Sequence, residues 1–137
     1  MTATKHEIFV PGMGPPLSHY CDAVAIGELL FVSGILPLDD QSQLVGGDDA
    51  QAQAEQVFAR LEQVLAAVGA QYADIVKVTL FLTDVNDRAA INGVRKRYFA
   101  QSRPASTLVE VSGLITPGAR LEVEAIARLP RPAPYGV

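Results

Sequence analysis

A strand with apolar side chains on both faces constrains the fold of this chain more than any other segment does. Residues 75–83 read IVKVTLFLT, and successive side chains of a strand point to opposite faces of its sheet. One predicted face carries Val76, Val78, Leu80 and Leu82. The other face carries Ile75 and Phe81, so both faces need to be covered in the folded protein.

The segments on either side of this strand have the spacing of helices and further strands. Residues 50–67 carry apolar side chains at intervals typical of one helix face, and Asp48 or Asp49 is a suitable N-cap. A second helix is predicted for residues 87–101. Further strands, separated by glycine and proline turns, are predicted within residues 21–37, 106–114 and 119–129.

This order of elements predicts an α+β domain with one mixed β-sheet and two helices on one face. Two helices cover only one face of such a sheet. Because residues 75–83 are apolar on both faces, the uncovered face is expected to meet another copy of the same sheet. A functional site would then lie between subunits.

Length and composition indicate a single domain that forms an oligomer. The 137 residues suit one domain over residues 1–137, with an N-terminal strand and loop in residues 1–17 and a proline-rich tail in residues 130–137. Hydrophobic residues make up 49% of the chain and charged residues 19%, which is more apolar surface than one small core hides.

Charge and cysteine content disfavour several classes of partner. The net charge is −4 and the basic residues are scattered, so no nucleic-acid partner is expected. Cys21 is the only cysteine, which rules out an intrachain disulfide and a cysteine-rich metal site. No segment has the apolar length of a signal peptide or a membrane span. These features predict a cytoplasmic protein without a membrane partner.

Six segments of the chain, in order, carry a family resemblance: FVSGILPLD, LVGGD, VKVTLFLTDVND, INGV…YF, PAST and LEVEAIA. Together they resemble the RidA family, also called the YjgF/YER057c/UK114 family, over residues 18–127. The resemblance implies a chorismate-mutase-like α+β fold and a homotrimer with a barrel-like core. It also implies clefts between subunits that bind small molecules, usually with a carboxylate. Active members hydrolyse enamines and imines to keto acids and ammonia, without a metal or an organic cofactor.

The resemblance places five residues of this chain in the family's cleft. Tyr20 matches the cleft tyrosine, Ser33 and Gly34 match the Ser-Gly pair after the second strand, and Asn92 matches the asparagine of the second helix. Glu122 matches the acidic residue that is thought to orient the attacking water. Tyr20 and Glu122 are therefore the predicted catalytic residues, and the other three are predicted to bind substrate.

One position departs from the family pattern. The family's Pro-Ala-Arg-Ser/Thr reads PAST at residues 104–107, so Ser106 replaces the arginine that clamps the substrate carboxylate. A guanidinium binds a carboxylate through two parallel hydrogen bonds, which serine does not reproduce. Ser106 and Thr107 remain predicted substrate-binding residues. His19 and Arg120 are the preferred replacements for the lost cation, ahead of Arg103. Arg120 is two residues before Glu122, so strand alternation predicts that it lies on the same face, about 7 Å away.

The predicted function is therefore hydrolytic deamination of an enamine, an imine or an amino-substituted unsaturated acid. Without the arginine, a protein that binds a small ligand and does not turn it over remains an alternative. An endoribonuclease, an activity attributed to some relatives, is a weaker alternative because the chain is acidic and has no basic stripe.

Overall fold

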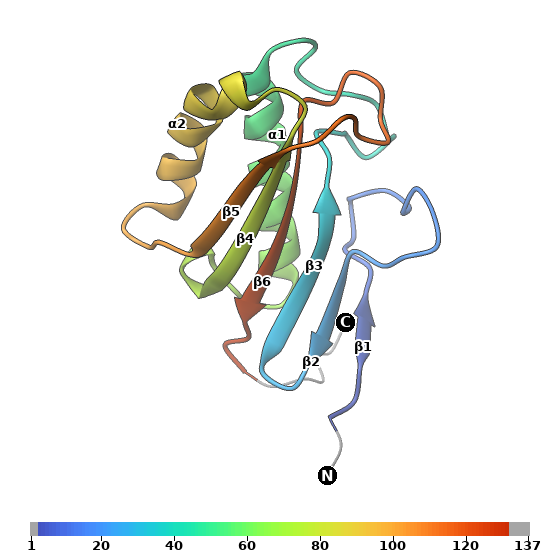
Figure 1. Ribbon diagram of the computed structural model, residues 1–137. Coiled ribbons are helices and arrows are strands. Elements are labelled where there is room, and N and C mark those ends of the chain that lie inside the picture. The colour runs from blue at the N-terminus through green and yellow to red at the C-terminus, as the bar shows by residue number, and fades with distance from the viewer. Residues whose placement is uncertain (1–2, 132–137) are drawn as a thin grey trace.

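Residues 3–131, which the computed structural model describes, form one six-stranded sheet with two helices packed on one face (Figure 1). The strands are β1 His6–Ile8, β2 Ala23–Ile26, β3 Leu29–Ile35, β4 Ile75–Leu82, β5 Ala105–Glu110 and β6 Leu121–Arg128. Their order across the sheet is β1-β2-β3-β6-β4-β5. β4 and β5 pair in parallel and the other neighbours pair antiparallel, so the sheet is mixed. The predicted α+β fold class is confirmed.

Helix α1 spans Ala50–Ala67, as the sequence predicts. It begins where the Asp49 side chain accepts hydrogen bonds from the backbone N–H groups of Gln51 and Ala52. Helix α2 spans Arg88–Phe99, after a 3₁₀ turn at Val85–Asp87, and a second 3₁₀ turn lies at Tyr72–Asp74. α2 ends earlier than predicted because Ala100 has a φ of 53°, which is outside the right-handed helical region.

The core lies between the two helices and the sheet. Along β6 the residues alternate, and the buried set faces the helices: Leu121, Val123, Ala125 and Ala127. From α1, Val57, Phe58, Leu61 and Val64 are fully buried against them. The alternate β6 residues, which include Glu122 and Glu124, therefore lie on the open face of the sheet.

Strand β4 differs from its prediction at its first two residues, because Ile75 belongs to the buried core with Val78 and Val76 is exposed. Ile75 pairs with Ala127 and Lys77 pairs with Ile126, so the register shifts at Val76. Such a bulge turns the extra residue out of the alternation. Val76 is 49% exposed, and the prediction that it shares a buried face with Val78 is wrong.

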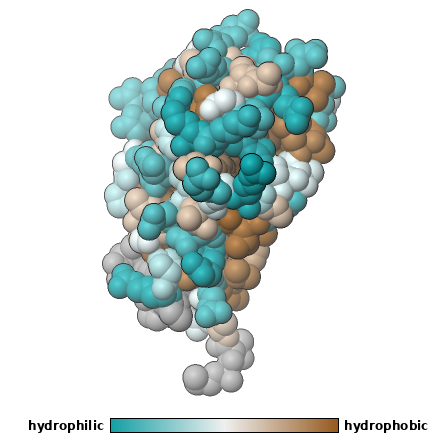
Figure 2. Space-filling model, turned by 90° about the vertical axis from the view of Figure 1, so that its left-hand side faces the viewer, coloured by the Kyte–Doolittle hydropathy of each residue, from teal (hydrophilic) through white to brown (hydrophobic). Residues whose placement is uncertain are grey.

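The open face of the sheet keeps a group of exposed apolar side chains, namely Leu29, Phe31 and Val109. Figure 2 looks onto the side of α2, which is mainly hydrophilic, and hydrophobic residues gather along its right-hand edge, toward which the open face is turned. Within residues 3–131, no helix is long and apolar enough to cross a membrane. The predicted tail of residues 130–137 lies, from residue 132 on, outside the described residues.

Candidate functional site

One hollow brings together four of the predicted site residues. Tyr20 comes from the loop between β1 and β2, Ser33 and Gly34 from the end of β3, and Glu122 from the start of β6. Leu17, Leu36 and Ile115 add apolar lining. Since β3 and β6 are neighbours in the sheet, pairing of the strands places the Ser-Gly segment beside Glu122.

Gly34 is in very close contact with Glu122. A Cβ atom at residue 34 would lie 2.0 Å from Oε1 of Glu122, inside any real contact distance. The register of β3 and β6 also shifts between Val32 and Ile35, which brings this backbone close to the carboxylate. A glycine is therefore needed here for the Glu122 side chain to keep its position.

The Glu122 carboxyl is half-buried, and its surroundings change its pKa. Burial raises the pKa of Glu122 above its usual value, and the neighbouring charge of Glu124 raises it further. A carboxylate with a raised pKa takes a proton from water more readily than an ordinary exposed carboxylate does. Glu122 is thus suited to act as a general base.

Hydrogen bonds hold the Tyr20 loop onto β3. The Ser33 hydroxyl donates to the backbone oxygen of Cys21 at 2.7 Å, and the Asp22 carboxylate accepts from the N–H of Val10 at 2.7 Å. The Tyr20 hydroxyl accepts from the N–H of Leu17 at 3.2 Å. A phenol hydroxyl can donate one hydrogen bond as well as accept one, so the Tyr20 hydroxyl can still donate to a group in the hollow.

The predicted residues Asn92, Ser106 and Thr107 do not line this hollow. Ser106 on β5 pairs with Val78 and Glu122 on β6 pairs with Phe81, with β4 between the two strands. Two strand spacings and three residues along the strands separate Ser106 from Glu122 by roughly 14 Å. One chain alone therefore does not assemble the whole predicted set.

Ser106 and Thr107 also face opposite sides of the sheet. Thr107 accepts a hydrogen bond at 2.6 Å from Nζ of Lys77, which lies on the open face. Ser106 is level with the buried Val78 and so points to the helix side of the sheet edge. The two hydroxyls therefore lie on opposite faces of the edge strand.

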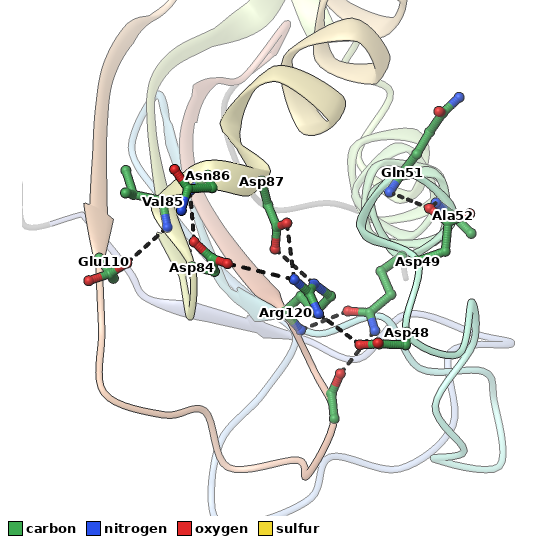
Figure 3. A network of polar contacts seen from close by, with 12 residues as sticks. Asp48, Asp49, Gln51, Ala52, Asp84, Val85, Asn86, Asp87, Glu110 and Arg120 are labelled. Atoms are coloured by element: carbon green, nitrogen blue, oxygen red, sulfur yellow. Dashed lines mark hydrogen bonds and ion pairs between the residues drawn. The ribbon is translucent and has the colours of Figure 1, made fainter.

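The guanidinium of Arg120 has carboxylate partners of its own (Figure 3). Nε and Nη2 donate to the two carboxylate oxygens of Asp87 at 2.8 and 3.1 Å, and Nη1 donates to Asp48 at 2.7 Å. These hydrogen bonds raise the pKa of Arg120. The guanidinium thus lies at the starts of α1 and α2, and not beside Glu122 as the strand alternation predicted.

The other two cations considered from the sequence are exposed. His19 precedes Tyr20 on the loop and Arg103 precedes β5, and neither lines the hollow. The sequence reasoning missed Arg60 of α1, which lies under the Tyr20 loop and lines an adjoining narrow hollow. The sequence did contain a signal for this contact, because Arg60 is next to Leu61, at the edge of the apolar face of the helix predicted for residues 50–67.

Among residues 3–131, no cluster of three or more His, Cys, Asp or Glu side chains is arranged to hold a metal ion. Cys21 donates a hydrogen bond from Sγ to the backbone oxygen of Ala23 at 3.2 Å. The polar side chains that line the hollow are the Glu122 carboxyl, the Tyr20 phenol and the hydroxyls of Ser18 and Ser33.

Comparison with known proteins identifies the family. A family model described as Endoribonuclease L-PSP matches residues 13–129. The chain belongs to this family, the RidA family. Members of the RidA family with assigned names include deaminases. The 3-aminoacrylate deaminase RutC of Acinetobacter baylyi is 38% identical over 124 residues, covering 90% of this chain and 98% of the relative.

A second RidA-family relative and one solved structure extend the comparison. The 2-iminobutanoate/2-iminopropanoate deaminase of Bos taurus is 38% identical over 129 residues, which is 93% of either chain. The crystal structure of E. coli TdcF with bound serine superposes with a TM-score of 0.81 at 32% identity, covering 90% of this chain and 98% of TdcF.

Proposed function

We propose that this RidA-family protein hydrolyses small enamines or imines to a carbonyl compound and ammonia. The observation that carries the proposal is the hollow in which Tyr20, Gly34 and the half-buried Glu122 meet. The names of the two deaminase relatives support the reaction class.

The residues of the hollow suit the two proton transfers that this reaction needs. Glu122 takes a proton from water as the water oxygen adds to the imine carbon. The Tyr20 hydroxyl donates a proton to the imine nitrogen, which becomes an amine. As the C–N bond of the adduct breaks, protonated Glu122 returns its proton to the leaving nitrogen, and the adduct's hydroxyl gives its proton back to Tyr20. This step releases ammonia and the carbonyl compound and restores both side chains. An enamine substrate first becomes its imine tautomer by gaining a proton at carbon and losing one from nitrogen.

We place the complete site between copies of the chain. Ser106 lies roughly 14 Å from Glu122. Asn92 does not line the hollow of Glu122, and the exposed apolar side chains of the open face favour contact with another copy. The family resemblance implies that three copies assemble. In that assembly a neighbour's Asn92 and Ser106 would complete the cleft.

The replacement of the family arginine by Ser106 affects which substrates the site is expected to bind. Ser106 offers one hydroxyl where a guanidinium would give two charge-assisted hydrogen bonds, so a substrate carboxylate is held more weakly. TdcF binds serine, a small molecule with a carboxylate and an amine, which supports a small ligand of this kind. We propose that the protein accepts a small amino-substituted acid and relies less on its carboxylate than relatives with the arginine do.

Ammonia release tests the proposal. Imines generated in solution from small amino acids, and 3-aminoacrylate, are supplied to the wild type and to Glu122→Gln. Glu122→Gln is expected to lower kcat/KM by about 100-fold or more, since it removes the general base. The matched control Glu124→Gln, on the same strand face, is expected to stay close to the wild type. Ser106→Arg is expected to lower KM for substrates with a carboxylate.

Failure of every such substrate, together with no gain from Ser106→Arg, would overturn the proposal. Thermal stabilisation by the same compounds without product would then favour a ligand-binding protein, the alternative that Ser106 suggests. The endoribonuclease activity in the description of the family model has less support, because the net charge of −4 opposes RNA binding.

A further inference from the structure

The loop that carries Tyr20 has few regular contacts of its own. Residues 9–22 connect β1 to β2 without a helix or strand, and Tyr20 is 43% exposed. A tyrosine that donates a proton to a substrate must keep its hydroxyl within a few tenths of an ångström of one position. Contacts from elsewhere in the fold are therefore expected to add to the loop's own hydrogen bonds in fixing Tyr20.

Arg60 reaches this loop from helix α1. Its Nη2 donates to the backbone oxygen of Met13 at 3.1 Å, and its Nη1 donates to the backbone oxygen of Leu38 at 2.6 Å. Met13 belongs to the Tyr20 loop and Leu38 to the segment that follows β3. One guanidinium thus joins two segments that are 25 residues apart in the chain to the same helix.

The two joined segments are also packed directly on each other. Gly14, next to Met13, has a φ of 76°, and a Cβ atom there would lie 2.3 Å from the backbone oxygen of Asp40. The narrow hollow above Arg60 shares Tyr20, Ser33 and Gly34 with the hollow that contains Glu122. Arg60 therefore lies behind the wall of the candidate site that Tyr20 forms.

The Arg60 guanidinium donates its hydrogen bonds to backbone carbonyls and not to a carboxylate. Its hydrogen bonds to Met13 and Leu38 go to backbone oxygens, and no ion pair of Arg60 occurs within residues 3–131. Burial lowers the pKa of Arg60, with the nearby charges of Asp22 and Asp39 acting against it. A planar fork with donors in fixed directions suits two acceptors on different segments, whereas a lysine ammonium is a flexible point charge.

We propose that Arg60 is a positioning residue that fixes Tyr20 in the candidate site by joining the Tyr20 loop to the segment after β3. The expected effect of Arg60 on activity rests on the proposed deaminase function. The expected effect of Arg60 on the structure, a Tyr20 loop held through Met13, does not depend on any activity.

Hydrogen exchange tests the structural consequence. Arg60→Met keeps the apolar stem and removes both hydrogen bonds. The marker is the N–H of Leu17, which is bonded to the Tyr20 hydroxyl. Its exchange is expected to become roughly tenfold faster, the effect of losing one hydrogen bond to a charged group. Gln56→Leu is the matched control, because Gln56 also donates to the Leu38 oxygen at 2.7 Å, whereas the hydrogen bond to the Met13 oxygen within residues 3–131 comes from Arg60. It should leave the exchange of Leu17 unchanged.

A double-mutant cycle tests the functional consequence. Arg60→Met is expected to lower kcat/KM on the order of tenfold in the wild-type background and much less in the Tyr20→Phe background, since the hydroxyl to be positioned is then absent. Arg60→Lys, which is the fallback if Arg60→Met does not fold, should recover part of the loss. Equal effects in both backgrounds, or unchanged exchange of Leu17, would overturn the proposal. If the wild type deaminates nothing, the exchange result still decides the role of Arg60, and only the proposed function fails.

Discussion

Gly34 and Glu122 form the tightest contact of the candidate site. The missing side chain at residue 34 leaves the space that the Glu122 carboxylate occupies, with Oε1 at 2.0 Å from the position of a Cβ atom. The position of the proposed general base thus depends on a residue that has no side chain.

Gly34→Ala is expected to push the Glu122 carboxylate away and leave the fold intact. The atoms that a methyl group would meet belong to the Glu122 side chain, which can rotate. Because a displacement of about 1 Å costs on the order of 100-fold in rate, kcat/KM should fall by that order while the unfolding midpoint changes by only a few degrees. Steady-state kinetics and a thermal melt measure the two effects. Wild-type kinetics in Gly34→Ala would contradict the contact.

Glu122 is expected to make the folded protein less stable at neutral pH than at acidic pH. Burial raises its pKa in the folded state, so the folded state binds its proton more tightly than the unfolded state does. The charged form therefore opposes folding above the raised pKa. Glu122→Gln should raise the unfolding midpoint at pH about 7 and leave it unchanged at pH about 3, where both side chains are neutral. The exposed Glu28→Gln is the control and should show no such difference.

The sequence predicted which residues line the hollow but not the contacts between them. Tyr20, Ser33, Gly34 and Glu122 were named from the family resemblance, and the structure brings them into one hollow. The contact between Gly34 and Glu122 depends on the register of two strands far apart in the chain, which local patterns do not encode. Arg120 was misplaced for a related reason, since its carboxylate partners come from other loops.

Among the elements, helix α1 connects to the start of β6 through one buried glutamine. Gln53 is fully buried, and its amide donates to the backbone oxygens of Gly47 at 2.7 Å and Gly118 at 2.9 Å. Its carbonyl oxygen accepts from the N–H of Arg120 at 2.7 Å. One side chain thus satisfies three backbone groups from the loops before α1 and β6.

Gln53→Leu is expected to lower the free energy of unfolding by roughly 2–4 kcal/mol, because leucine is similar in size but cannot form the three part-buried hydrogen bonds to the backbone. Urea denaturation followed by circular dichroism measures the loss. Gln63→Leu is the matched control, since Gln63 is exposed on the same helix and the change should stay within about 0.5 kcal/mol. A similar effect of both substitutions would show that the burial of Gln53 has little importance.

Element bounds were predictable where local signals agree. For α1, the Asp49 cap and the apolar spacing point to the same residues, and the predicted range equals the observed one. For β4, simple alternation placed Val76 on a buried face, but a bulge opposite β6 exposes it. A bulge arises from the pairing of two strands, so a pattern within one strand does not reveal it.

For the whole molecule, the open face and the divided site lead to the same conclusion. The exposed Leu29, Phe31 and Val109 lie on the sheet face that the helices do not cover, and Asn92 and Ser106 lie away from the hollow that contains Glu122. Contact between copies that covers the open face and also reaches past the edge strand β5 would cover the apolar side chains and bring the two parts of the site together. Assembly and activity are therefore expected to be linked.

Phe31→Glu is expected to separate the copies and to lower activity in parallel. Phe31 is 41% exposed at the centre of the open face, and a charge there opposes burial against another sheet. Light scattering after gel filtration should give a multiple of 14.6 kDa for the wild type and close to 14.6 kDa for Phe31→Glu. Ala66→Glu, on the exposed side of α1, is the control and should leave the mass unchanged.

The concentration dependence of activity then distinguishes a shared site from a merely adjacent interface. If each site needs residues from two copies, the specific activity of Phe31→Glu should rise with protein concentration as copies reassociate. A monomeric Phe31→Glu protein with wild-type activity would show that one chain holds the complete site. A monomeric wild type with activity would lead to the same conclusion, and Asn92 and Ser106 would then have no part in binding substrate.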